Sequence, residues 1–269
     1  MATLPNPLPH LASDPSGRGL GLQLPPGKLV DANWPQPLLW YADQPSSSGN
    51  WTALGTRSAQ AGLLPVLVDV DKYWLEREGW ELDPAMASYP GDHDAEDVLA
   101  EFWEQDEEGY DEDDDALRAP FALAWPGLAP ATTATADPDT RAAQLADEIS
   151  EKNGMGFTEP HLALVPARRS ADIPAAIGWT GPLNHDNDVA RLCAVLRSWE
   201  DRFGARVVAI GFATLAVSVA APPTTQAEAE AIAAEHYAFC PDNIDQGSGT
   251  IEVYAKELIG TQSWHFWWD

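Results

Sequence analysis

The sequence predicts an α+β fold, and its C-terminal third predicts this most clearly. An apolar stripe at helical spacing runs along residues 188–203. Two β-rich runs follow at 206–211 and 215–220, and the few residues between them are typical of a hairpin. Helices combined with adjacent paired strands favour an antiparallel sheet with helices packed on one face.

The other C-terminal elements complete an order of alternating strands and helices. They are a strand at 161–165, a helix from the Thr225/Glu228 capping box to Phe239, a turn at 241–249, a short helix at 250–258 and an aromatic strand at 264–268. The order β-α-β-β-α-(α)-β is that of a ferredoxin-like layer. We therefore expect a C-terminal domain over residues 159–269.

A smaller α+β unit is expected upstream, over residues 34–125. Apolar runs at 37–42 and 63–70 are broken by Gly, Ser and Asn and are typical of strands. Residues 94–105 show helical spacing behind an aspartate that can cap a helix. The unit therefore combines short strands with one helix.

Two further segments have compositions that argue against a packed core. Residues 1–33 are rich in Pro and Gly and predict an arm that lies on the surface or is disordered. Residues 126–158 begin with a Pro, Ala and Thr stretch, so we expect a linker with a helix at 140–152. The linker would join the two units, and whether they form one domain or two stays open.

The charge is strongly negative. Lys and Arg number 15 against 42 Asp and Glu, which gives a formal net charge of −27. Such a field repels nucleic acid and anionic membranes and attracts basic proteins. We therefore expect a basic protein as partner, and neither nucleic acid nor a membrane.

Composition also indicates the compartment. The two cysteines, Cys193 and Cys240, do not suit a disulfide scaffold. No signal-peptide pattern occurs at 1–27, and no apolar run approaches the length of a membrane span. The sequence therefore predicts a cytoplasmic protein.

An acidic run occupies residues 104–115 and predicts a solvated loop, because like charges repel one another. Asp111, Asp113 and Asp115 alternate as in a calcium loop. The central Gly and the closing Glu of such a loop are missing, so calcium is the less favoured interpretation.

Several short motifs together resemble the bacterial family catalogued as domain of unknown function 4253, which is known from actinomycetes. They are Leu164-Val165-Pro166, Gly178-Trp179, Ala194–Gly204, Val219–Pro223, Ala234–His236, Cys240–Asn243 and Phe266–Asp269, with weaker upstream similarity at Leu64–Leu67 and Gly79–Leu82. The resemblance covers about residues 161–269 and implies no activity. The chain departs from the family pattern at Ala213, where Asp is common, and at Asp245, where an aromatic residue is common.

One candidate site combines His236, Cys240 and Asp242. His236 and Cys240 are four residues apart and share a helix face, with Glu235 adjacent. A thiolate with a histidine base would suit nucleophilic catalysis, and the same pair could form half of a zinc site. Zinc lacks further ligands with suitable spacing, so no metal and no cofactor is predicted. A buried cysteine beside a hydrogen-bonded histidine is the favoured structural alternative.

A second candidate site would bind a ligand through polar loop side chains. Its residues are Asn184, His185, Asp186, Asn243 and Gln246. Loops carry binding sites more often than cores do, whereas polar residues after proline also form simple turns. The sequence therefore marks these residues as the place to look for a ligand.

Positive charge concentrates on one helix and the strand after it, at Arg191, Arg197, Arg202 and Arg206. These side chains could bind an anion, since guanidinium matches carboxylate and phosphate. Pairing with Glu200, Asp201 and the acidic half of the protein is the favoured interpretation.

The sequence alone supports no standard enzyme class, because Ser-His-Asp spacing, a Walker loop, a dinucleotide-binding turn and a zinc-protease motif do not occur. We expect a non-enzymatic protein-binding module of the immunity or regulatory type. The alternative is a small cofactor-independent enzyme or ligand-binding domain that uses a pocket at His236, Cys240 and Asp242.

Overall fold

The computed structural model describes residues 1–269 except 1–4, 33, 70–81, 106–116, 122–123 and 153. The acidic run with its three alternating aspartates therefore lies mostly outside the described residues, as does most of the Gly79–Leu82 motif.

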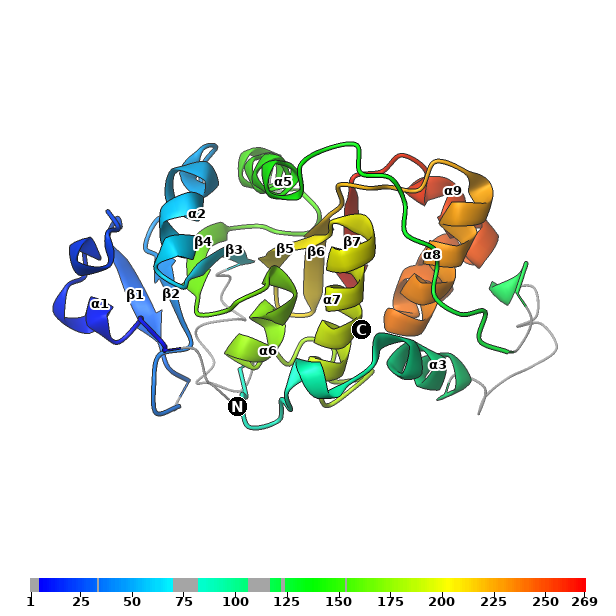
Figure 1. Ribbon diagram of the computed structural model, residues 1–269, viewed down its shortest axis with the longest axis horizontal. Coiled ribbons are helices and arrows are strands. Elements are labelled where there is room, and N and C mark those ends of the chain that lie inside the picture. The colour runs from blue at the N-terminus through cyan, green and yellow to red at the C-terminus, as the bar shows by residue number, and fades with distance from the viewer. Residues whose placement is uncertain (1–4, 33, 70–81, 106–116, 122–123, 153) are drawn as a thin grey trace.

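The described strands form one seven-stranded sheet in the order β1-β2-β4-β3-β5-β6-β7. The strands are β1 (Gly27–Val30), β2 (Leu39–Ala42), β3 (Leu64–Asp69), β4 (Pro160–Val165), β5 (Arg206–Ile210), β6 (Thr214–Ser218) and β7 (Ser263–Trp267). Strands from both halves of the chain thus share one sheet (Figure 1).

The fold is α+β, as predicted, but the sheet is mixed rather than antiparallel. β3 runs parallel to β5 and antiparallel to β4, so an N-terminal strand lies between two C-terminal ones. The ferredoxin-like order is therefore not confirmed. The sequence pattern of the C-terminal third contained no signal that β3 would lie between β4 and β5, because the pairing of β3 depends on contacts between residues distant in sequence.

Helices cover both faces of the sheet, whereas the sequence predicted helices on one face. They are α1 (His10–Ser13), α2 (Asn50–Gln60), α3 (Ala95–Gln105), α5 (Pro138–Lys152), α6 (Ile173–Ile177), α7 (Val189–Phe203), α8 (Gln226–Phe239) and α9 (Ile251–Leu258). α2 and α5 pack on one face, and α6 and α7 pack on the other (Figure 1). α8 and α9 lie beyond β7 at one end.

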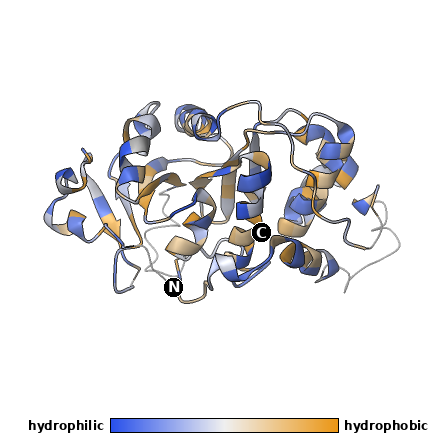
Figure 2. Cartoon of the chain, viewed as in Figure 1, coloured by the Kyte–Doolittle hydropathy of each residue, from blue (hydrophilic) through white to orange (hydrophobic). Residues whose placement is uncertain are grey.

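Alternation along β3 explains why both faces must be covered. Val66 and Val68 belong to the core cluster that includes α7, and Leu67 belongs to the cluster with α2 and α5. Successive side chains of a strand point to opposite faces, so a strand with apolar residues on both faces needs apolar cover on both. Figure 2 shows hydrophobic strands between helices whose outer turns are hydrophilic.

The helix boundaries follow from local capping. The Asp188 side chain accepts from the Ala190 amide at the start of α7, and Gly204 at φ 61° ends that helix. Thr225 and Glu228 form the predicted capping box of α8. The Thr250 hydroxyl accepts from the Val253 amide and starts α9. Each cap satisfies backbone groups that the helix itself leaves unpaired.

The N-terminal segment differs from the predicted arm. Leu8, Leu11 and Leu22 are buried and form a core cluster with Trp40 and Leu164. β1 also pairs with β2 and extends the sheet. Proline and glycine shape the turns of this segment. The high proline and glycine content led to the prediction of an arm, although the leucines between them are buried.

Gly178 joins the two halves of the chain at close range. Its φ is +66°, and an added Cβ would lie 2.2 Å from the Pro84 nitrogen. The Asp83 amide donates to the Gly178 carbonyl at 2.6 Å, and Leu82 forms a bridge with Trp179. Only glycine suits both the backbone angle and this contact.

The last strand places its aromatic side chains on two different faces. Trp264 and Phe266 are buried in the core with Trp199, whereas Trp267 is half-buried on the other face. β7 lies at the edge of the sheet and pairs only with β6 among the described strands. The aromatic ending is thus part of the main core.

None of the helices in the described ranges is long and apolar enough to cross a membrane.

Trp264→Ala should lower the free energy of unfolding by about 3 to 5 kcal/mol, because a buried ring leaves a cavity. Trp267→Ala is the matched control and should lower it by less, since this ring is half-buried. Urea denaturation of both variants measures the difference. Equal losses would show that the face assignment of β7 is wrong.

Candidate functional site

His236 lies in the aromatic core rather than in an open pocket. Its side chain is fully buried, and its ring centroid lies 4.5 Å from that of Trp264 and 4.9 Å from that of Phe266. The Tyr254 hydroxyl lies 3.1 Å from Nδ1, and Nε2 has no hydrogen-bond partner among the described residues. Burial and the nearby Arg202 charge hold the pKa of His236 well below its usual value, so the ring is neutral at pH 7.

Cys240 is also buried, and among the described residues its thiol forms no hydrogen bond with the His236 ring. Sγ donates to the Trp267 carbonyl at 3.0 Å and lies 3.5 Å from Asn243 Oδ1. Burial raises the pKa of the Cys240 thiol far above its usual range. A thiol that stays protonated and covered lacks the thiolate character of a nucleophile.

Asn243 closes the outer edge of β7. Its Nδ2 donates to the His265 carbonyl at 2.7 Å, and its Oδ1 accepts from the Trp267 amide at 3.3 Å. The carboxamide thus occupies the place of a peptide group on a neighbouring strand. Together with Cys240 it satisfies backbone groups that an edge strand would otherwise expose.

The structure brings three of the predicted polar residues together around the backbone of Asp269. The side-chain nitrogen Nδ2 of Asn184 donates to the backbone oxygen of Asp269. The backbone amide of Asp269 donates to Asp242 Oδ2 at 3.1 Å. Gln246 Nε2 donates to Asp242 Oδ1 at 2.7 Å. These contacts fasten the end of the aromatic segment to two loops.

His185 and Asp186 lie apart from this cluster. The His185 ring packs 4.6 Å from Phe102, and Asp186 pairs with Arg191 at 2.7 Å. The predicted ligand-binding residues are therefore divided between two places. His185 contacts α3, whereas Asn184 and Gln246 belong to the hydrogen bonds that hold the C-terminal segment.

The four concentrated arginines are all paired with acids, as expected, but mostly with other acids than the predicted Glu200 and Asp201. Arg191 pairs with Asp186 and Arg197 with Asp172. The remaining two pairs are Arg202 with Glu235 and Arg206 with Asp139.

Ser88, His93 and Asp188 form a cluster that sequence spacing did not reveal. The Ser88 hydroxyl lies 2.6 Å from His93 Nε2, and Asp188 Oδ2 lies 3.7 Å from the same nitrogen. A catalytic triad needs its serine and its acid at opposite nitrogens of the ring. This arrangement therefore does not position the histidine as a relay.

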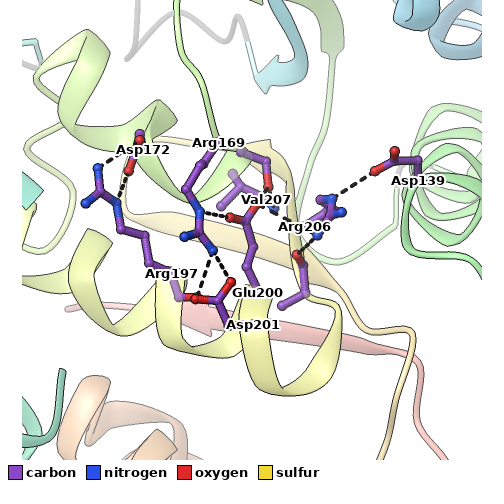
Figure 3. A network of polar contacts seen from close by, with 10 residues as sticks. Asp139, Arg169, Asp172, Arg197, Glu200, Asp201, Arg206 and Val207 are labelled. Atoms are coloured by element: carbon purple, nitrogen blue, oxygen red, sulfur yellow. Dashed lines mark hydrogen bonds and ion pairs between the residues drawn. The ribbon is translucent and has the colours of Figure 1, made fainter. Parts of the chain in front are cut away.

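A cleft of about 1030 Å³ lies between α2, α5 and the loop that follows β4. Trp51, Leu64, Pro65, Ala142 and Ala143 supply its apolar lining. A polar network forms the opposite side, and Figure 3 shows how its residues converge. The cleft therefore offers both apolar and charged contacts to a ligand.

Glu200 is the centre of this network. Its Oε2 accepts from Arg169 Nε at 2.6 Å, and its Oε1 accepts from the Ser170 hydroxyl at 2.8 Å. The same hydroxyl accepts from the Val207 amide at 3.1 Å. The network therefore joins the loop after β4 to α7 and β5 and fixes one side of the cleft (Figure 3).

Sequence reasoning did not identify the cleft. Its charged residues come from four separate segments of the chain, represented by Asp139, Arg169, Asp201 and Arg206. No local spacing links them, because tertiary packing of α5, the loop after β4, α7 and β5 brings them together. The two adjacent arginines at 168–169, shortly after the predicted strand at 161–165, were the one sequence feature that could have indicated a charged site here.

Among the described side chains, no group of three or more His, Cys, Asp or Glu is arranged to hold a metal ion.

The geometry defines an α+β protein with a mixed sheet, a cleft lined by α2, α5, α7 and the loop after β4, and a closed C-terminal corner. Residues 161–269 match the family model described as Domain of unknown function (DUF4253), which confirms the resemblance over these residues. No curated protein and no solved structure significantly matches the chain.

Both thiols should resist modification in the folded protein. Cys193 and Cys240 are buried, and burial raises the pKa of each. We expect a thiol reagent at pH 8 to label neither residue until denaturant is added. Rapid labelling of Cys240 in the native protein would contradict the closed corner and favour a reactive site.

The free energy of unfolding should fall as the pH falls below 6.5, the usual pKa of histidine. The unfolded chain binds a proton at His236 that the folded protein does not, so a single such group costs about 1 kcal/mol between pH 6.5 and 5.5. His265, whose pKa burial also lowers, adds to this slope. His236→Gln should therefore show a shallower dependence in urea titrations, and an unchanged slope would contradict a neutral, buried His236.

Proposed function

We propose that this protein acts in the cytoplasm by binding a basic protein partner, as an immunity-type or regulatory module rather than as an enzyme. The observation that carries the proposal is the distribution of charge. Acidic residues exceed basic ones by 42 to 15, and much of the scarce positive charge is neutralised inside the fold. The paired arginines are Arg141, Arg169, Arg191, Arg197, Arg202 and Arg206.

Internal pairing leaves the net charge at −27 but engages arginine donors that an anionic partner would need. An arginine held between carboxylates within the fold offers fewer free donors to an anionic partner. Exposed carboxylates then dominate the surface, and they attract a basic protein over several ångströms and raise its association rate. The same field disfavours nucleic acid, whose phosphates carry the same sign of charge.

The C-terminal corner supports a non-enzymatic role. A neutral His236, a protonated Cys240 and an Asn243 engaged with β7 are the properties of a packed edge. The alternative function, an enzyme or ligand-binding site at His236, Cys240 and Asp242, requires an accessible thiol. Thiol labelling therefore discriminates between the two functions.

Free Cys193 and Cys240 suit a reducing compartment such as the cytoplasm, where thiols persist.

The association rate with a basic partner purified by affinity capture should fall as salt rises, because exposed charges are screened over about 8 Å at physiological ionic strength. Stopped-flow measurements at low and high salt test this, with dissociation rates as the internal control. Steering acts mainly on association, so dissociation should change less. An association rate indifferent to salt would contradict the proposal.

A further inference from the structure

In two ion pairs of the cleft between α2 and α5, the carboxylate is more exposed than the arginine that it binds. Asp139 and Asp201 expose 82% and 69% of their side chains. Their partners Arg206 and Arg169 expose only 26% and 35%. At these two pairs, a molecule that approaches the cleft therefore meets the carboxylate before the arginine.

Each of these two carboxylates keeps accepting capacity. Asp201 Oδ1 accepts from Arg169 Nη2 at 2.6 Å, and Asp139 Oδ1 accepts from Arg206 Nε at 2.9 Å. Oδ2 of each has no hydrogen-bond partner among the described residues. A carboxylate can accept several hydrogen bonds, so both oxygens are available to a cationic donor.

The lining of the cleft as a whole also carries a net negative charge. Its acids are Asp137, Asp139, Glu200 and Asp201, and its bases are Arg168, Arg169 and Arg206. Arg168 is exposed and could contact an anionic group, yet the acids still outnumber the bases. The balance favours a cation over an anion.

The opposite side of the cleft is apolar. α2 contributes Trp51, Gly55 and Ala59, and α5 contributes Ala142 and Ala143. The small residues Gly55, Ala59, Ala142 and Ala143 leave room for aliphatic side chains, and the lining residues from α2 carry no charge. A volume of about 1030 Å³ suits a short peptide segment better than a single ion.

We propose that this cleft is the docking site for a segment of the basic partner that presents arginine or lysine side chains beside aliphatic ones. The cations lie against Asp139 and Asp201, and the aliphatic side chains lie against α2 and α5. This proposal rests on the proposed function and deepens it, because it assigns the place and the chemistry of recognition.

The test uses two synthetic peptides, acetyl-Leu-Arg-Leu-Arg-Leu amide and its counterpart with glutamate in place of arginine, titrated into the full chain by calorimetry. We expect saturable binding of one basic peptide per chain and no binding of the acidic one. Equal binding of the two peptides would overturn the assignment of a cationic ligand.

A blocking variant tests the place of binding. Ala59→Trp puts a large ring on an exposed residue that lines the cleft, and it should weaken the basic peptide about tenfold or more. Ala53→Trp makes the same change at an exposed residue of α2 outside the lining, and it should leave binding within about twofold.

A charge variant tests the contacts. The double variant Asp139→Asn/Asp201→Asn should weaken the basic peptide about fivefold or more. The matched control Glu252→Gln/Glu257→Gln removes two charges from α9, which contributes no residue to the cleft, and should have little effect. Equal weakening by the two double variants would indicate attraction to the whole surface and overturn the proposed contacts.

The outcomes separate this inference from the function on which it rests. If Ala59→Trp binds the peptide as the wild type does, the cleft is not the docking site, while partner binding stands. If the wild type binds neither the basic peptide nor any basic partner, both proposals fail. A concentration-dependent dimer that Ala59→Trp abolishes would assign the cleft to a second copy of the chain and overturn the inference.

Discussion

The buried carboxylate of Glu235 is the interaction on which the helical half of the core depends. It accepts from both terminal nitrogens of Arg202 at 2.6 Å, from Trp199 Nε1 at 2.7 Å and from the Ala129 amide at 2.6 Å. These four bonds join α7, α8 and the segment before α5 at one point. A buried charge that loses its partner typically costs about 3 to 5 kcal/mol, so the pairing fixes how these elements pack. Trp199, held by this carboxylate, then stacks at 5.5 Å on Phe266 of the last strand.

The need to satisfy buried polar groups also explains the positions of His236, Cys240 and Asn243, the residues whose types looked most reactive. An edge strand must satisfy its outward amides and carbonyls, and β7 does so through Asn243 and Cys240 rather than through another strand. The Tyr254 hydroxyl accepts from Asn243 Nδ2 at 3.3 Å and is free to donate to His236 Nδ1. His236, Cys240 and Asn243 thus form one hydrogen-bonded set around the strand edge. A cluster of rare polar residues in a sequence can therefore serve to pair the backbone of an edge strand as readily as to form a catalytic site.

The sequence predicted elements well wherever a local signal existed. The capping box of α8, the glycine that ends α7 and the β5–β6 hairpin depend on neighbours a few residues apart. It failed where contacts between distant segments decide the outcome. The position of β3 between β4 and β5 depends on apolar cover from both faces, and the burial of Leu8 and Leu22 depends on Trp40. For the candidate sites, residue types were visible, but whether His236 and Cys240 face solvent or rings depends on tertiary packing.

The cleft follows from the feature of the fold that sequence patterns missed. Because β3 is apolar on both sides, α2 and α5 must cover the face opposite α7, and the gap between them meets the loop after β4. That loop brings Arg169 and Ser170 to Glu200, and their bonds hold the rigid side of the cleft. Two exposed carboxylates of the cleft, Asp201 and Asp139, are each held by a less exposed arginine. An acidic protein can thereby present separate, fixed negative groups beside an apolar surface, and such an arrangement can discriminate among basic partners where net charge alone cannot.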